Sequence, residues 1–420
     1  MTRGGWLLAA IALGLVAITA AAALLIWEPA LPPIPPPAAT SFDHTTVLHG
    51  EALAHLGNCR TCHTAPGGQP FAGGRALRTP FGTIYTTNIT PDPETGIGRW
   101  SAAAFARAMR EGVSRDGRFL YPAFPYDHFA RVSDSELDAL YAFLMTRPAA
   151  PAKTAENRLD WPFGYRPLLA IWNLLFLSSE PTGDGDRGRS LAEGLAHCGA
   201  CHTPRNRWGA EISGRAYDGA WTEGWYAPPL NARSPAVRPW TADELFIYLR
   251  TGVGRTHAAA AGPMRNVTRE LAAAPEADVR AIAAYFAGLM ADAPAAKGDA
   301  MLQDRQDHAD QAHAEGAILF AGACAACHET GAPLMQQGRP PLGWTTSLQE
   351  KTPHNTLHVI VQGLTPPPGR AGPSMPGFGN DFSDRQLGEI AAYLRARYTD
   401  LPPWQDLDAA VADVRKAAGE

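Results

Sequence analysis

The stretch Cys59-Arg60-Thr61-Cys62-His63 has the pattern C-x-x-C-H, and the pattern returns twice along the chain, at Cys198 to His202 and at Cys324 to His328. This pattern is the attachment signature of c-type haem, because two cysteines three residues apart can bond the two vinyl groups of one porphyrin. The histidine that follows is then placed to bind the iron. The three copies predict three covalently bound haem c groups. The predicted attachment residues are Cys59, Cys62, Cys198, Cys201, Cys324 and Cys327, and the predicted proximal iron ligands are His63, His202 and His328.

Other interpretations of a C-x-x-C pair are a redox dithiol or half of a zinc site. The chain contains six cysteines, and the three copies use all of them. A zinc site would not explain a histidine directly after every second cysteine. The haem interpretation is therefore favoured, and no cysteine remains for a disulfide or a nucleophile.

The length of 420 residues predicts about three domains, at one per ~150 residues, in agreement with the three motifs. The chain contains 41 glycines and 37 prolines, which indicates abundant loops, as expected of small domains built around a porphyrin. The formal net charge of -5 gives no basic surface for nucleic acid. We therefore expect no nucleic-acid partner.

The N-terminal segment from Trp6 to Trp27 carries no charge. At about 1.5 Å per residue it is long enough to cross a hydrocarbon core of about 30 Å. We expect an uncleaved transmembrane anchor in the bacterial inner membrane, with Arg3 inside and the haem regions in the periplasm. The alternative is a secretory signal cleaved near Ala20 to Ala22. The six prolines between Pro29 and Pro37 predict a stiff spacer after this segment.

The expected organisation follows from the motifs and from shifts in composition. It consists of an anchor and spacer over 1–42, a first cytochrome c domain over 43–147, a connector over 148–182, a second domain over 183–291, a linker over 292–312, a third domain over 313–400 and a tail over 401–420. The connector contains the apolar run Leu168 to Leu177, which is too short to span a bilayer. It is interpreted either as an internal packing segment or as an interfacial helix, docking face or quinone-site wall.

Each repeat predicts a helix before its motif and another at its end. The opening helices share a Gly-x-x-Leu pattern, at Gly50, Gly188 and Gly316. The closing helices are expected over 134–147, 276–290 and 384–397, with apolar residues at matching positions. Ser133 and Ser383 are expected N-caps. Middle helices are expected over 100–111 and 240–251, with a degenerate third copy over 357–362.

Together with the three motifs, the segments Gly82-Thr-Ile-Tyr-Thr-Thr-Asn-Ile-Thr-Pro91 and Ser374-Met-Pro-Gly-Phe378 resemble the tri-haem cytochrome c subunit of membrane-bound periplasmic dehydrogenases, over nearly all of the chain. The repeats and this resemblance predict a mainly α fold of three tandem class I cytochrome c-like domains after an N-terminal transmembrane helix. The resemblance implies electron transfer from a catalytic subunit, which is a quinoprotein, flavoprotein or molybdopterin dehydrogenase, to ubiquinone or a terminal oxidase. The segments Trp240 to Leu245 and Ala261 to Met264 are more similar to relatives that serve molybdopterin dehydrogenases.

The second axial ligand of each iron is expected in the loop before the closing helix, since methionine in that position raises the potential. Counting twelve residues from Gly112, Gly252 and Gly363 leads to Phe124, Met264 and Met375. We expect Met264 and Met375 to be ligands. A methionine could instead be core filler.

Phe124 cannot bind iron, so the first repeat needs another ligand. His128, four residues further on, is the candidate, and it would give a bis-histidine iron of lower potential. The alternative is a solvated loop histidine beside an open iron.

The sequence leaves two rival functions. An open iron in the first repeat would suit a peroxidase-like haem enzyme, whereas irons with protein ligands on both faces suit electron relay. The other rival is a cytochrome subunit of a terminal oxidase.

Four arginines close to the first two motifs are candidates either for haem propionate contacts or for solvated loop positions. They are Arg75, Arg78, Arg205 and Arg207.

Overall fold

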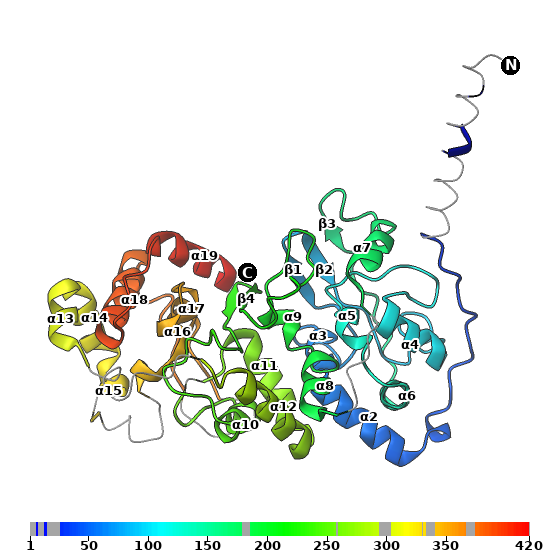
Figure 1. Cartoon of the computed structure of the whole chain (residues 1–420), viewed down its shortest axis with the longest axis horizontal. Helices are drawn as coiled ribbons and strands as arrows, with labels where there is room; N and C mark the ends of the chain where they lie inside the picture. Colours follow the sequence, from blue (N-terminus) through cyan, green and yellow to red (C-terminus); the bar gives the residue numbers. More distant parts are fainter. Residues whose placement is uncertain are drawn as a thin grey trace. The chain divides into compact units, whose positions relative to one another are not determined.

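A computed structural model gives the fold of the chain, which is mostly helical with a few short strands (Figure 1). The structure describes Trp6 and residues 12–14, 26–178, 185–257, 259–293, 304–329, 331–332, 341–366 and 374–419. The chain divides into two compact units, the first over 1–54 and 59–182 and the second over 55–58 and 183–420. The second and third C-x-x-C-H motifs lie in the same unit. They share it because residues that follow the third motif pack on a hairpin that follows the second, and the division into three domains stays a prediction.

The first unit contains the first motif. In chain order its elements are η1 (Ala39–Ser41), α2 (His44–Leu56), α3 (Cys59–Cys62), β1 (Ala76–Thr79), β2 (Gly82–Tyr85), α4 (Ala102–Glu111), α5 (Tyr126–Phe129), α6 (Asp134–Met145), β3 (Arg158–Leu159) and α7 (Leu168–Phe176). The strands form an antiparallel sheet in the order β1-β2-β3.

The second unit contains the other two motifs. Its elements around the second motif are α8 (Arg187–Glu193), α9 (Gly199–His202), β4 (Ala220–Thr222), β5 (Trp225–Ala227), α10 (Ala242–Thr251), α11 (Gly262–Leu271) and α12 (Glu276–Leu289). Those around the third are α13 (Gln306–Ala312), α14 (Ala314–Ala323), α15 (Ala325–His328), η4 (Leu342–Trp344), α16 (Thr346–Gln349), α17 (His354–Gln362), α18 (Asp384–Tyr398) and α19 (Leu407–Gly419).

In each repeat the opening helix crosses the closing helix at a glycine. A Cβ atom on Gly50 would lie 1.9 Å from the carbonyl oxygen of Ala139 in α6. The corresponding distances are 2.2 Å for Gly188, against Ala281 in α12, and 2.5 Å for Gly316, against Glu389 in α18. Only glycine allows so close an approach of two backbones. The Gly-x-x-Leu pattern therefore marks the helix crossing on which each repeat is built.

The closing helices confirm their predicted positions to within two residues. Ser133 and Ser383 both form capping boxes, in which the serine hydroxyl accepts the backbone N–H of the third helical residue. The predicted apolar positions face the core, and Leu137, Val279 and Leu387 are at most 1% exposed.

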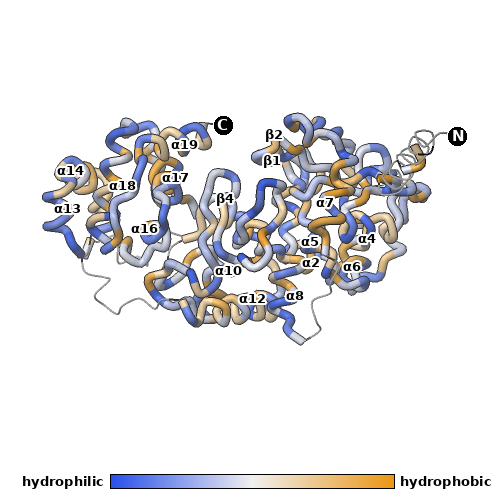
Figure 2. The backbone as a smooth tube through the Cα atoms, turned by 45° about the horizontal axis from the view of Figure 1, so that its top comes forward, coloured by the Kyte–Doolittle hydropathy of each residue, from blue (hydrophilic) through white to orange (hydrophobic). Residues whose placement is uncertain are grey.

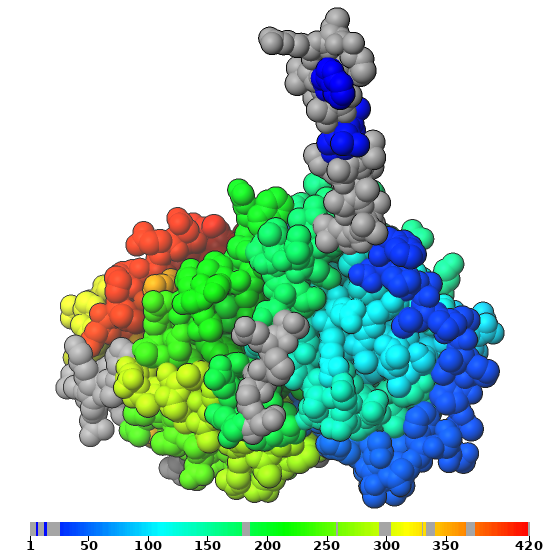
Figure 3. All heavy atoms as spheres, turned by 45° about the vertical axis from the view of Figure 1, so that its right-hand side comes forward, coloured from blue at the N-terminus to red at the C-terminus, as the bar shows by residue number. Residues whose placement is uncertain are grey.

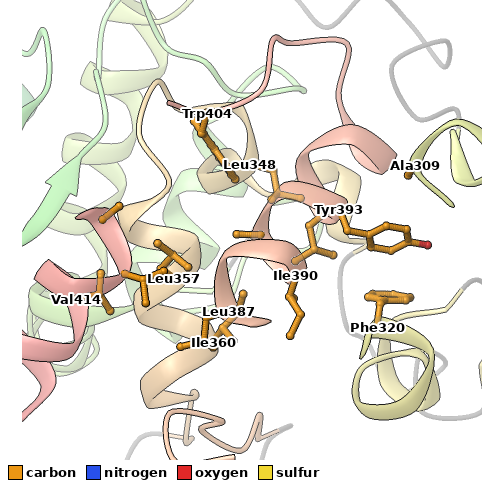
Figure 4. Close-up of a cluster of buried hydrophobic side chains, with 14 residues drawn as sticks. Ala309, Phe320, Leu348, Leu357, Ile360, Leu387, Ile390, Tyr393, Trp404 and Val414 are labelled. Atoms are coloured by element: carbon orange, nitrogen blue, oxygen red, sulfur yellow. The ribbon is translucent and has the colours of Figure 1, made fainter. Parts of the chain in front are cut away.

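The core of the third repeat extends beyond its predicted limits. Figure 4 shows Tyr393 of α18 beside Phe320 of α14, with ring centroids 5.4 Å apart. Within the stretch expected as a linker, α13 buries Ala309 in the same cluster. In the expected tail, Trp404 and Val414 join it as well, and the opposite face of α19 lies on the surface (Figure 3).

The two hairpins β1–β2 and β4–β5 are equivalent, and each has its outer edge covered by an asparagine from a later segment. The backbone N–H of Tyr85 in β2 donates to Oδ1 of Asn157 at 2.9 Å. In the same way, the N–H of Tyr226 in β5 donates to Oδ1 of Asn355 at 3.0 Å, and Nδ2 of Asn355 donates to the Tyr226 carbonyl at 2.7 Å. Asn355 thus occupies the place of a neighbouring strand.

Two aromatic pairs reinforce the contact between α17 and the β4–β5 hairpin. Trp225 stacks on His358 with ring centroids 4.4 Å apart, and Nε2 of His358 donates to the carbonyl of Gly224. Trp221 meets His354 edge to face at 4.7 Å. These contacts join the second and third repeats into one unit.

Replacing Asn355 by leucine should loosen this junction. The substitution leaves the N–H and the carbonyl of Tyr226 without their partner, which costs about 2 kcal/mol for two part-buried polar groups. Urea unfolding should therefore begin at a lower concentration. The exposed Asn380, replaced by leucine, is the matched control and should leave the midpoint unchanged. Equal midpoints for both variants would contradict this role of Asn355.

The helix α7 has one packed face and one exposed face. Its Trp172 lies against Tyr126 at 5.7 Å, and the Tyr126 hydroxyl donates to Oδ1 of Asn173 at 2.7 Å. Leu174 and Leu175, on the other face, are 67% and 65% exposed. Figure 2 shows the helix as a hydrophobic segment of the chain. One face of the apolar run is therefore an internal packing segment, and the opposite face is exposed.

The predicted transmembrane anchor is corrected. Among the described residues, no helix combines the length and the apolar character that crossing a membrane requires. Most of the segment from Trp6 to Trp27 lies outside those residues. The prediction of an inner-membrane location through this anchor is corrected with it.

Candidate functional site

Each C-x-x-C-H motif lies on a short helical turn directly after an opening helix. In all three motifs the backbone N–H of the histidine donates to the carbonyl of the first cysteine, at 2.9 to 3.1 Å. The same turn therefore carries both thiols and the imidazole. All six cysteine side chains are half-buried. Burial raises the pKa of Cys198 to about 12 and that of Cys324 to about 11, so both thiols are protonated at neutral pH.

Two of the three histidines are held in the orientation that an iron ligand needs. Nδ1 of His63 donates to the carbonyl of Thr87, and Nδ1 of His202 donates to the carbonyl of Pro228, both at 2.7 Å. A hydrogen bond of this kind fixes the tautomer and leaves Nε2 as the coordinating atom. Burial lowers the pKa of both histidines, which favours the neutral form that binds metal. These residues fit a covalently attached haem. After the third motif, residues 333–340 lie outside the described residues.

A threonine directly after the histidine braces the first two motifs, and its role was not predicted from the sequence. Oγ1 of Thr64 accepts the backbone N–H of Phe71, and Oγ1 of Thr203 accepts that of Tyr217, both at 3.1 Å. Phe71 and Tyr217 have φ values of 64° and 61°, which non-glycine residues rarely adopt.

Each of these aromatic residues packs edge to face on its closing helix. The ring of Phe71 lies 5.9 Å from that of Phe143, and the ring of Tyr217 lies 5.0 Å from that of Phe286. The recurring C-x-x-C-H-T pattern, with an aromatic residue eight or fifteen positions after the histidine, was the available signal.

Two of the four candidate arginines brace the attachment turns. Nη1 of Arg75 donates to the carbonyl of Thr61, and Nη2 of Arg205 donates to that of Ala200. Both carbonyls belong to the residue before the second cysteine, so two arginines at different distances from their motifs make the same contact. This contact supports the thioether-forming turn. Arg207 instead lies over the ring of Trp208 at 5.1 Å.

The predicted distal residues have different local surroundings. His128 is buried in the short helix α5. Met264 is the third residue of α11, so it lies at a helix start and not in the expected loop. Met375 is half-buried, forms a two-way backbone bridge with Leu364 and packs on the core of the third repeat.

The count of twelve residues from the glycine does not lead to equivalent backbone positions. In the first two repeats the bridging partners are Phe119 and Ala259, five residues before Phe124 and Met264, whereas Met375 is itself the bridging residue. The structure thus places both methionines between a middle and a closing helix, but in different backbone conformations, since Met264 lies at a helix start and Met375 forms a β-bridge.

Comparison with known proteins gives matches along nearly the whole chain. The chain is 34% identical over 428 residues to the cytochrome c subunit of the quinone-dependent alcohol dehydrogenase of Gluconobacter oxydans, covering 96% of this chain and 85% of the relative. It is 37% identical over 381 residues to the gluconate 2-dehydrogenase cytochrome c subunit of Pantoea cypripedii, covering 84% of this chain and 85% of the relative. The chain belongs to the cytochrome c subunits of dehydrogenase complexes.

This cytochrome c subunit also has a relative of different length. It is 44% identical over 408 residues to a subunit of the nicotinate dehydrogenase of Pseudomonas putida, covering 95% of the chain but only 34% of the relative, so the chain spans about a third of that protein. The family described as cytochrome C oxidase, cbb3-type, subunit III matches residues 311–394, which contain the third motif. The cytochrome c subunit therefore binds haem c covalently and transfers electrons.

Proposed function

We propose that this cytochrome c subunit carries three haem c groups and relays electrons from a dehydrogenase catalytic subunit to ubiquinone or a terminal oxidase. The observation that supports it most is the recurrence of one attachment turn, each following an opening helix that crosses its closing helix at a glycine. Haem iron supplies one-electron chemistry when bound. The six cysteines would attach it, and the three histidines that follow them would bind its iron.

The proposed axial pairs are His63 with His128, His202 with Met264, and His328 with Met375. A ligand on each face closes the iron to substrates and limits rearrangement on electron transfer, which suits a relay. The bis-histidine pair would have the lowest potential of the three. Electrons would then leave through one of the methionine-ligated irons.

The catalytic partner is proposed from the relatives, whose names place them with alcohol, gluconate and nicotinate dehydrogenases. The identity of 44% to the nicotinate dehydrogenase subunit exceeds that to the alcohol and gluconate dehydrogenase subunits, which favours a partner that oxidises an N-heterocycle. This choice agrees with the similarity of Trp240 to Leu245 and Ala261 to Met264 to relatives of molybdopterin enzymes.

Haem content tests the proposal directly. The chain, produced in a host that matures cytochrome c, should keep its haem stain after denaturing electrophoresis and contain three haems per polypeptide by the pyridine haemochrome assay. The reduced protein should not bind carbon monoxide. Fewer than three haems would contradict the relay as proposed, and rapid carbon monoxide binding would favour a haem enzyme with an open first iron.

A further inference from the structure

The third attachment turn departs from the other two at the residue after its histidine. Thr64 and Thr203 occupy this position in the first two repeats, whereas the third has Glu329. Its carboxylate receives both arms of one guanidinium, since Nη2 and Nη1 of Arg397 donate to Oε1 and Oε2 at 2.6 and 3.1 Å. A bidentate pair of this kind fixes geometry as well as charge.

Arg397 is fully buried near the end of α18, 0% exposed, and its surroundings are unusual for a cation. Its Nε and Nη2 also donate to the two carboxylate oxygens of Asp304, at 2.7 and 2.6 Å. The ring of Phe320 lies 5.0 Å from the guanidinium carbon, and Nη1 donates to the Tyr393 hydroxyl at 3.2 Å. Burial alone would lower the pKa of Arg397, but its hydrogen bonds to Asp304 and Glu329 raise it, so it stays charged.

The position equivalent to Arg397 in the other repeats does not provide this contact. Arg147 lies four residues after Phe143, as Arg397 lies four after Tyr393, but it follows α6, and its Nε donates to the carbonyl of Phe143 in that helix. Its guanidinium lies over the Phe143 ring at 4.2 Å. The second repeat has Leu289 there. A buried arginine bonded to the residue after the haem histidine is therefore a feature of the third repeat among the described residues.

From these contacts we propose that Arg397 is a positioning residue of the third haem, and that the charge of the Arg397–Glu329–Asp304 cluster sets the potential of that haem apart from the other two. This inference rests on the proposed three-haem relay. Glu329 is covalently adjacent to His328, so the ion pair ties the attachment turn to the closing helix. Ferric haem has one positive charge more than ferrous haem, so a nearby positive charge favours the reduced form and a negative charge the oxidised form.

Three variants test the role of charge. With both carboxylates ionised the cluster carries a net charge of -1. Arg397→Met makes the cluster more negative and should lower the midpoint potential of one haem, shifting its oxidation equilibrium about tenfold toward the ferric form. Glu329→Gln removes one negative charge and should raise the potential of the same haem. The double variant restores the net charge and should return the potential close to that of the wild type.

The measurement is a spectroelectrochemical titration of the full chain, with haem content determined on each sample. Arg147→Met is the matched control and should leave the third haem unchanged. Single variants that retain three haems with all potentials unchanged would overturn the proposal. A double variant whose midpoint potential differs from the wild-type value by more than that of either single variant would also overturn it. If Arg397→Met loses a haem, the proposal is tested by Glu329→Gln alone, through the direction in which the midpoint potential of one haem shifts. A wild-type chain with fewer than three haems would instead contradict the relay itself.

Discussion

Gly316→Ala is expected to destabilise the third repeat by about 2–3 kcal/mol, the usual range for overpacking a tight contact. The added Cβ would lie 2.5 Å from the carbonyl oxygen of Glu389 and 2.7 Å from Cβ of Tyr393, so α14 and α18 must move apart. Both helices flank the third attachment turn. We therefore expect a lower unfolding midpoint in urea and loss of part of the haem from the third motif.

The same helix offers a matched control. Gly322 also lies in α14, and a Cβ built there meets no atom within 4 Å. Gly322→Ala should stabilise the chain by about 0.5–1 kcal/mol, because alanine in an exposed helix restricts the unfolded chain and favours the helix. Circular dichroism and haem content would be followed for both variants. Similar stability changes for the two would show that the helix crossing does not depend on Gly316.

Met264→Leu is expected to open one iron without disturbing the fold. Leucine has nearly the volume of methionine, so the cost in stability should stay below about 1.5 kcal/mol. It has no sulfur to bind iron. The variant should lose the methionine–iron charge-transfer absorption of one haem, lower the potential of that haem and bind one equivalent of carbon monoxide when reduced.

A buried methionine in the same unit serves as the control. Met290 follows α12 and is 5% exposed in the core. Met290→Leu should leave the absorption spectrum, the potentials and the lack of carbon monoxide binding unchanged. If Met264→Leu behaves like Met290→Leu, the second iron has another distal ligand, and the assignment of Met264 is wrong.

Much of the helical framework could be predicted from the sequence, because it depends on local patterns. Apolar residues three or four positions apart located the closing helices, and Ser133 and Ser383 located their starts. The repeated glycines marked the opening helices, whereas their role at the helix crossings follows only from the structure. These features depend on short stretches that look alike in all three repeats.

The rest depends on contacts between segments far apart in the chain. Asn355 pairs with Tyr226 across 129 positions, and Arg397 pairs with Glu329 across 68. Neither partner carries a local pattern that marks it. Counting twelve residues from the glycine also did not predict that Met264 lies at a helix start, since the repeats differ in loop length. Apolar composition and length were the main basis for the anchor, and the described residues contain no helix that meets those requirements.

Each hairpin edge is covered by an asparagine from a later segment of the chain. This arrangement limits where repeats can be exchanged, by gene duplication or in the laboratory. β2 depends on Asn157 of the segment that follows its repeat, and β5 depends on Asn355 from within the next repeat. A segment exchanged from the second haem motif to the third would therefore leave the outer edge of β5 without Asn355, and Trp221 and Trp225 without the two histidines of α17. A junction placed after α17 would keep Asn355, His354 and His358 together with the hairpin that they cover.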